Sequence, residues 1–322
     1  MQVTRLVPML VMLVPLLSSS APATFHPAAV DGVLELLRSA DIVLLGERHW
    51  SRLDADLRNE LVAHPDLPSI ATTVVVEFGN LLYQETLDRY LLQLEPVPDS
   101  QLALVWRNTR TTTGAWDSPL YEEFYRTVRR VNESLPAESR IRVIAAGQPV
   151  DWDRVEVWED LLPFTHRGWW FTRQIERVMT RGEKAVVILG LGHFLRMDDE
   201  MEEDYNVIRR LEALHPGRSF KVVVPFAEKS GSAGRVAEAL PEVTTPVLLD
   251  AAGEPFAAWP SADFFHGGVG EIQEAVDALI YFGPVHDELV GPPEGFYEED
   301  RAYAAELERR RGLGRRLPGS YN

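Results

Sequence analysis

Two glutamates and two histidines each follow a short apolar run of the chain closely, where a strand would end. They are Glu47, His49, Glu77 and His193. Two carboxylates and two imidazoles suit a divalent metal that takes nitrogen and oxygen ligands. An imidazole oriented by a carboxylate can also take a proton from water without a metal. His49 is the base in the metal-free alternative; in the other it is a metal ligand, and a glutamate takes the proton.

The apolar runs predict the strands that must position these side chains. They cover residues 41–45, 73–76, 141–145, 185–189, 221–224, 247–249 and 278–281. Near-continuous apolar runs of this length are typical of strands buried on both faces of a parallel sheet. Amphipathic helical patterns alternate with the strands, at residues 29–38, 52–63, 80–93, 119–131, 168–181 and 204–214. The alternation predicts an α/β fold, a single domain with a mostly parallel central sheet, helices on both faces and helical insertions.

The strand ends predict that the four side chains gather at one site. In open α/β sheets the carboxyl ends of parallel strands line the ligand crevice. Gly46-x-x-His49 and Gly190-x-x-His193 share one spacing, each directly after an apolar run. Glycine lets the backbone turn sharply there and lets other groups approach it closely.

A first predicted insertion, residues 94–118, is of the kind that often forms a lid or a pocket wall. It contains Arg107, which we expect to stabilise the oxyanion that forms when water attacks a carbonyl. A structural role is the alternative for this region. Glu77 needs a partner if it is buried, and an ion pair with Arg48 or Arg107 would provide one.

A second predicted insertion, residues 147–167, contains the secondary candidates Gln148 and Asp151. Both follow the third strand closely enough to reach the same rim. Asp151 has an alternative role, because aspartate often caps a helix, and one is predicted to begin near Trp152.

Composition excludes several classes of protein. The chain has no cysteine, so disulfides, thiolate metal sites and cysteine nucleophiles are excluded. The formal net charge of −17 argues against a broad interface with nucleic acid, whose phosphates would be repelled. No phosphate-binding loop, serine nucleophile elbow or His-Glu-x-x-His helix occurs. The expected partner is a small-molecule or peptide substrate.

The two ends of the chain differ in character from the middle. Residues 1–23 combine Arg5, an apolar run and a small polar exit, as in a secretory signal peptide. The run is shorter than the roughly 20 residues that span a bilayer, so no stable membrane span is expected in the mature form. We expect residues 24–297 to form the α/β domain of an exported protein, periplasmic or extracellular. Residues 298–322 are expected to form a charged, solvated helix or tail.

Three motifs resemble those of the superfamily that contains Tiki proteases, erythromycin esterases and ChaN-like proteins. They are Leu44-Leu45-Gly46-Glu47-Arg48-His49, Val75-Val76-Glu77 and Leu189-Gly190-Leu191-Gly192-His193-Phe194. Tiki-type proteases carry two Gly-x-x-His motifs and a glutamate, all present here. In erythromycin esterases the matching element is Gly-Glu-x-x-His, with one more residue between Glu and His than in Glu47-Arg48-His49. The chain is therefore nearer the Tiki and ChaN form. Bacterial members usually carry an acid where Gln148 stands, so this position departs from the pattern.

The resemblance implies different functions for different branches. Tiki-like members are metal-dependent peptidases, and erythromycin esterase-like members use a histidine base to hydrolyse a macrolactone. ChaN-like members bind haem or iron. We therefore expect a hydrolase that activates water at Glu47, His49, Glu77 and His193, either with a divalent metal or directly. The alternatives are a haem- or iron-binding protein without catalysis and a non-catalytic relic of the fold.

Overall fold

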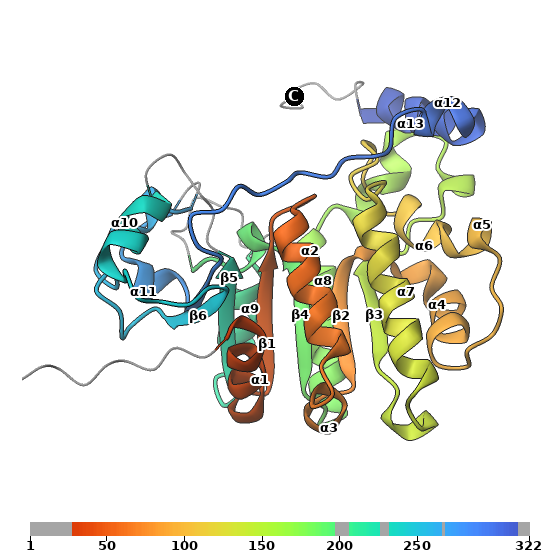
Figure 1. Ribbon diagram of the computed structural model, residues 1–322. Helices are drawn as coiled ribbons and strands as arrows, with labels where there is room; N and C mark the ends of the chain where they lie inside the picture. The colour runs from red at the N-terminus through yellow and green to blue at the C-terminus, as the bar shows by residue number, and fades with distance from the viewer. Residues whose placement is uncertain (1–27, 197–205, 226–231, 266–267, 315–322) are drawn as a thin grey trace, which may run out of the picture.

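The computed structural model describes residues 28–196, 206–225, 232–265 and 268–314. These residues form one seven-stranded sheet with the strand order β3-β2-β4-β1-β5-β7-β6 (Figure 1). All neighbours are parallel except β6 and β7. The strands are β1 Ile42–Glu47, β2 Thr73–Asn80, β3 Arg142–Gly147, β4 Ala185–Gly190, β5 Phe220–Pro225, β6 Val247–Asp250 and β7 Ala278–Tyr281. The predicted fold class, α/β with a mostly parallel sheet, is confirmed.

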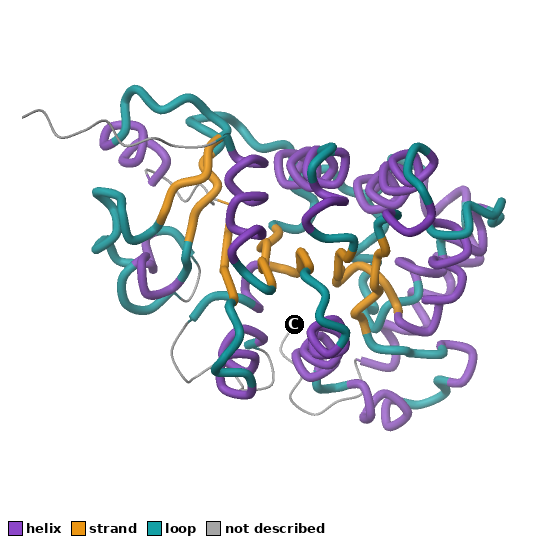
Figure 2. The backbone as a smooth tube through the Cα atoms, turned by 90° about the horizontal axis from the view of Figure 1, so that it is seen from below, coloured by secondary structure: helices purple, strands orange, loops and turns teal. Residues whose placement is uncertain are grey.

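Helices cover both faces of the sheet, as the view along the strands in Figure 2 shows. The main helices are α1 Ala29–Ser39, α2 Arg52–Ala63, α4 Gln84–Leu91, α7 Pro119–Glu133, α8 Arg167–Thr180, α9 Val207–Leu214, α10 Ser232–Ala239 and α13 Arg301–Gly314. The shorter ones are α3 Leu67–Ile70, α5 Asp99–Leu102, α6 Leu104–Arg107, α11 Ile272–Ala275 and α12 Phe296–Glu299. Because α1, α2 and α7 share one core and α8 and α9 share another, the molecule has three layers.

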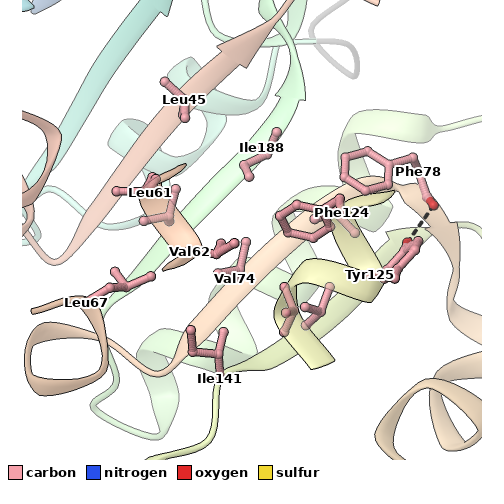
Figure 3. Close-up of a cluster of buried hydrophobic side chains, with 14 of the residues drawn as sticks. Leu45, Leu61, Val62, Leu67, Val74, Phe78, Phe124, Tyr125, Ile141 and Ile188 are labelled. Atoms are coloured by element: carbon pink, nitrogen blue, oxygen red, sulfur yellow. Dashed lines mark hydrogen bonds between the residues drawn. The ribbon is translucent and has the colours of Figure 1, made fainter. Parts of the chain in front are cut away.

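The two cores follow from the alternation of side chains along each strand. Val43 and Leu45 of β1 pack toward α1, α2 and α7, whereas Leu44 packs toward α8 and α9. Figure 3 shows the first core, in which Leu61 of α2 and Phe124 of α7 lie over the strands. Both faces of the strands are therefore buried, and only their ends can carry a polar site.

β2 is longer than predicted, because it continues beyond residue 76 as far as Asn80. Phe78 is fully buried in the first core, where it packs against Phe124 and Tyr125. This burial extends the strand. Glu77 therefore lies within β2 and faces the α8 side of the sheet, opposite to its neighbours Val76 and Phe78.

In the described part of the C-terminal segment, helix α13 packs against both insertions through its few buried residues, while the rest of its surface is exposed or half-buried. Arg310 of α13 is only 2% exposed, and its guanidinium donates to the backbone oxygen of Arg107 at 2.9 Å and to Asn108 Oδ1 at 2.6 Å. Leu313 packs with Trp152 of the second insertion. Two buried leucines, Leu307 and Leu313, and the buried side chain of Arg310 thus dock this charged helix.

The predicted signal peptide, residues 1–23, lies outside the described residues. The division into residues 1–23, 24–297 and 298–322 stays a prediction. In the described part of the chain, no helix is both long and apolar enough to cross a membrane.

Candidate active site

Three adjacent strands carry the predicted side chains to one edge of the sheet. β4 lies between β1 and β2, and Glu47 stands opposite Gly190 in the register of β1 and β4. The 3-10 turn η5, Leu191–His193, follows β4 directly. Glu47 faces α2 and α7 while Glu77 faces α8, so the site straddles the sheet edge and joins the two faces.

Gly190 lies where the side chains of His49 and Glu77 come together. A Cβ at this position would lie 3.0 Å from His49 Cε1, 3.1 Å from His49 Nε2 and 3.3 Å from Glu77 Oε2. The backbone N–H of Gly190 donates to Glu77 Oε2 at 2.7 Å. Any side chain would push these groups away, so the glycine lets His49 and Glu77 approach the same point.

Glu47 orients His49 and is itself fixed by two buried partners. His49 Nδ1 lies 3.1 Å from Glu47 Oε1, and the Tyr121 hydroxyl donates to the same oxygen at 2.9 Å. Arg58 Nη1 donates to the other oxygen at 2.9 Å. The Trp116 ring meets the imidazole edge-on, with the ring centroids 4.7 Å apart. Because the carboxylate accepts from Nδ1–H, the second ring nitrogen, Nε2, becomes the proton acceptor.

Glu77 is buried beside a guanidinium and an imidazole. Its Oε1 lies 3.3 Å from Arg167 Nη1 and 3.6 Å from His193 Nε2. Both distances exceed a good hydrogen bond, and Oε1 has no hydrogen-bond partner among the described residues. His193 is 2% exposed and meets the Phe171 ring edge-on. One oxygen of Glu77 thus keeps the capacity to accept a further hydrogen bond from a substrate or a water.

The electrostatic environment raises the pKa of His49 and lowers the pKa of Glu77. Burial disfavours the charged form of His49, but the hydrogen bond to Glu47 and the negative charges of Glu77 and Glu47 together raise the pKa of His49 above 6.5. Burial also works against an ionised Glu77, yet the neighbouring His193, Arg167 and His49 hold the pKa of Glu77 well below its usual range. Glu77 is therefore an anion at any physiological pH, whereas His49 holds a proton more tightly than a free imidazole does.

All four predicted side chains line a single pocket of about 230 Å³. Arg48, Arg167 and the loop 190–192 complete it. The side chain of His49 is 42% exposed, whereas the two glutamates and His193 are buried. Of these four side chains, the His49 imidazole is therefore the most accessible to a substrate.

Arg107, predicted to stabilise an oxyanion, does not line this pocket. Its Nη1 pairs with Asp300 at 2.8 Å, and its guanidinium lies 4.8 Å from the ring centroids of both Phe296 and Tyr303. The C-terminal helices thus enclose Arg107 on the outside of the first insertion. A contact across nearly 200 residues of sequence cannot be read from local pattern.

The predicted partners of Glu77 are also wrong. Arg107 pairs with Asp300, and Arg48 pairs with Asp54 and with Asp287, the latter at 3.1 Å. Arg167, the first residue of α8, takes the place of both, because Glu77 faces the α8 side of the sheet.

The secondary candidates have structural roles. Asp151 caps the 3-10 helix η3, Trp152–Arg154, by accepting from the backbone of Asp153 at 3.2 Å. Gln148 is buried and donates to the backbone oxygen of Phe164 at 3.2 Å. Phe164 is the last residue of the 3-10 helix η4, Trp158–Phe164, and lies three residues before Arg167. Neither residue lines the pocket.

Three residues of the site were not predicted from the sequence: Arg58, Tyr121 and Arg167. Arg58 lies on the buried face of α2 and stacks on Phe78 and Tyr121. A charged residue among the apolar residues of a helix face is a signal, because burial of a guanidinium requires a partner.

A divalent metal does not fit the four predicted ligands. Among the described residues, no group of three or more histidine and acidic side chains is arranged to hold a metal ion. The reason lies in the neighbours: Glu47 is engaged by Arg58 and Tyr121, and Glu77 faces Arg167. A cation bound between these carboxylates would have to approach two guanidinium groups.

The fold and the site together define an α/β protein with a histidine–glutamate pocket at the carboxyl end of its sheet. No protein-family model and no curated protein sequence matches the chain. Among solved structures, a Bacillus cereus protein superimposes with a TM-score of 0.53 at 12% identity, over 82% of this chain and 94% of that one. A succinoglycan biosynthesis protein gives a TM-score of 0.55 at 12% identity, over 79% and 90% of the two chains.

A third similar structure, of ChaN from Campylobacter jejuni with cofacially bound haem, gives a TM-score of 0.36 at 16% identity, over 62% of this chain and 86% of that one. At 12% identity, the similarity to the first two structures establishes a shared fold. Function must be argued from the pocket itself.

Proposed function

We propose that the protein is a hydrolase of carboxylic esters in which His49 acts as a general base on water. The observation that supports this most directly is the hydrogen bond between His49 Nδ1 and Glu47, at 3.1 Å. It leaves Nε2 as a proton acceptor inside the pocket, as catalysis by an oriented imidazole requires. The motifs around His49 and His193 support membership of the Tiki, erythromycin esterase and ChaN superfamily. Their spacing is nearer the Tiki and ChaN form, but the metal-free histidine base proposed here is the chemistry of the erythromycin esterase branch.

The proposed step needs no metal. A water oxygen attacks the ester carbonyl carbon while His49 Nε2 takes a proton from the water. The tetrahedral oxyanion then collapses, the bond to the leaving alkoxide breaks, and the imidazolium returns its proton to that alkoxide. The products are a carboxylic acid and an alcohol, and His49 is neutral again.

Other residues of the pocket support this step. Glu47, fixed by Arg58, stabilises the imidazolium that forms when His49 accepts the proton. Arg167, which lines the pocket, takes the role predicted for Arg107 and stabilises the oxyanion. His193 and Arg167 keep Glu77 ionised.

A panel of esters, lactones and peptides, assayed with the purified protein before and after exhaustive chelation, tests the proposal. We expect hydrolysis of at least one ester or lactone and expect it to survive chelation, because both carboxylates already face guanidinium groups. Activity that disappears with chelation and returns with zinc would support the metal-dependent alternative instead. A protein inactive on the whole panel would be a non-catalytic relic of the fold.

Haem binding is the second alternative, which the resemblance to ChaN-like proteins implies. A haem titration separates it from the proposal, because bound haem gives a saturable Soret band. We expect no such band that depends on His49. A band lost in the His49→Ala protein would favour the ChaN-like function.

A further inference from the structure

The segment between β7 and α12 crosses the carboxyl end of the sheet (Figure 1). Its residues 287–290, which we call the strap, lie antiparallel to residues 50–53, with a bridge between Leu289 and Ser51. Residues 50–53 follow His49 directly and lead into α2. Two segments about 236 residues apart in the sequence thus meet beside the loop that carries His49.

Asp287 of the strap binds residues on both sides of His49. Its carboxylate accepts from the Ser51 hydroxyl at 2.7 Å and from the backbone N–H of Leu53 at 3.3 Å, and it lies 3.1 Å from Arg48 Nη1. Ser51 is the N-cap of α2, and Leu53 lies in the first turn of that helix. A carboxylate is favourable there, because it accepts from an N–H group that has no partner within the helix and interacts well with the helix dipole. Asp287 thus fixes the start of α2 relative to Arg48, which lines the pocket.

Trp50, the residue after His49, has an unusual backbone conformation. Its φ of 70° lies in the left-handed region, which a bulky side chain rarely adopts. Its backbone oxygen accepts from the N–H of Val290 in the strap at 2.8 Å. Its indole Nε1 donates to the backbone oxygen of Ala115 at 2.7 Å, and its backbone N–H donates to the Tyr121 hydroxyl at 3.3 Å. A disfavoured conformation persists only where its surroundings enforce it, and the strap is one of these surroundings.

The backbone at Trp50 and the position of the His49 ring are coupled. Nδ1 of His49 lies 3.1 Å from Glu47 Oε1, and the ring meets Trp116 edge-on. Tyr121 connects the two residues, because its hydroxyl accepts from the N–H of Trp50 and donates to Glu47. The side chain of His49 is 42% exposed, so packing holds it only in part. The adjoining backbone must therefore be fixed for the ring to stay in place.

We propose that Asp287 is a positioning residue for His49, and that hydrolysis requires the strap to lie against residues 50–53. With the strap in place, Trp50 keeps its left-handed conformation and the imidazole stays beside Glu47. Without the strap, Trp50 relaxes to an ordinary backbone conformation and the imidazole leaves its position. A displacement of about 1 Å from the reacting geometry can cost about 100-fold in rate. As a statement about catalysis this rests on the proposed hydrolase function, whereas the placement of the ring by the strap does not.

Nuclear Overhauser effects between the ring protons of His49 and Trp116 test the placement without any need for catalysis, because the ring centroids lie 4.7 Å apart. The His49→Ala spectrum assigns the imidazole signals. We expect cross-peaks between the two rings in the wild type and their loss in Asp287→Ala. Glu288→Ala is the matched control, because Glu288 is the exposed next residue of the strap, carries the same charge and makes no side-chain hydrogen bond within the described part of the chain. Its cross-peaks should equal those of the wild type.

Steady-state kinetics with the best ester substrate measures the effect on catalysis. In Asp287→Ala we expect kcat to fall about 10- to 100-fold while KM changes little, because the base is displaced but the rest of the pocket is kept. Glu288→Ala should keep the wild-type kcat. Asp287→Asn keeps an acceptor oxygen and should recover part of the activity and of the cross-peaks. Urea-induced unfolding establishes the folded fraction to which each kcat is referred, since the loss of a helix cap lowers stability.

Wild-type cross-peaks together with a wild-type kcat in folded Asp287→Ala overturn the proposal and leave the hydrolase function untouched. If Asp287→Ala does not fold, the same two measurements on Asp287→Asn decide, and wild-type values in that variant overturn the proposal. If the wild type hydrolyses no ester yet its cross-peaks depend on Asp287, the hydrolase proposal fails while the placement of His49 by the strap stands.

Discussion

The His49→Ala protein is expected to retain its fold and lose about 10²- to 10⁴-fold in kcat/KM for ester hydrolysis, the usual contribution of a general base. The side chain of His49 is 42% exposed, so its removal opens little core. The imidazole is the group of the pocket that combines a fixed ring, an acceptor nitrogen and access to solvent. Steady-state kinetics with the best substrate of the panel measures the loss.

His64→Ala is the control for this variant. His64 caps α2 and accepts from the backbone of Asp66 at 3.2 Å, away from the pocket. It should hydrolyse the same ester at the wild-type rate. Equal rates for His49→Ala and His64→Ala would remove His49 from the mechanism.

The Arg58→Ala protein is expected to lose about 3–5 kcal/mol of unfolding free energy, the usual result of breaking a buried ion pair. The side chains of Arg58 and Glu47 are each only 3% exposed and lie 2.9 Å apart. Arg58 also donates to the backbone oxygen of Leu120 at 2.9 Å, which ties α2 to α7. Its loss leaves the buried Glu47 without its ion-pair partner. Urea-induced unfolding measures the effect.

Arg52 provides the comparison on the same helix. Its ion pair with Glu123 joins the same two helices but is exposed, so Arg52→Ala should lose only about 0–1 kcal/mol. Arg58→Lys keeps the charge but not the planar geometry, so its stability should fall between those of the wild type and Arg58→Ala. Equal stability of Arg58→Ala and Arg52→Ala would mean that the buried pair does not hold the two helices together.

Sequence pattern predicts the sheet well because its strands are buried on both faces and therefore almost wholly apolar. The run at residues 185–189 is one such case, and β4 extends it only to Gly190. β2 shows where sequence pattern fails. Its last residues are stabilised by Phe78, whose partners Phe124 and Tyr125 lie on α7, far along the chain. Such packing leaves no local signature.

The site, too, was predicted only in part: the residues at strand ends were found, and those on helices were not. The glutamates and histidines were found because each lies at or just beyond the end of an apolar run, and the carboxyl ends of the strands converge in this class of fold. The arginines that pair with the two glutamates come from helices, and the position of a helix over the sheet cannot be predicted from local sequence. Arg167 nevertheless carried a weak signal, since an arginine at the first position of α8 opposes the helix dipole. The ion pair with Glu77 offsets this unfavourable interaction with the helix dipole.

The pH dependence of kcat/KM in the wild type and in Glu47→Gln is the most direct test of the Glu47–His49 pair. His49 must be neutral to accept a proton, so activity should rise with pH through the raised pKa of His49, above 6.5. Loss of the Glu47 charge removes both the hydrogen bond to a carboxylate and an attractive charge. The account predicts that the rise in activity moves to lower pH in Glu47→Gln. A rise that stays in place, or moves to higher pH, would contradict it.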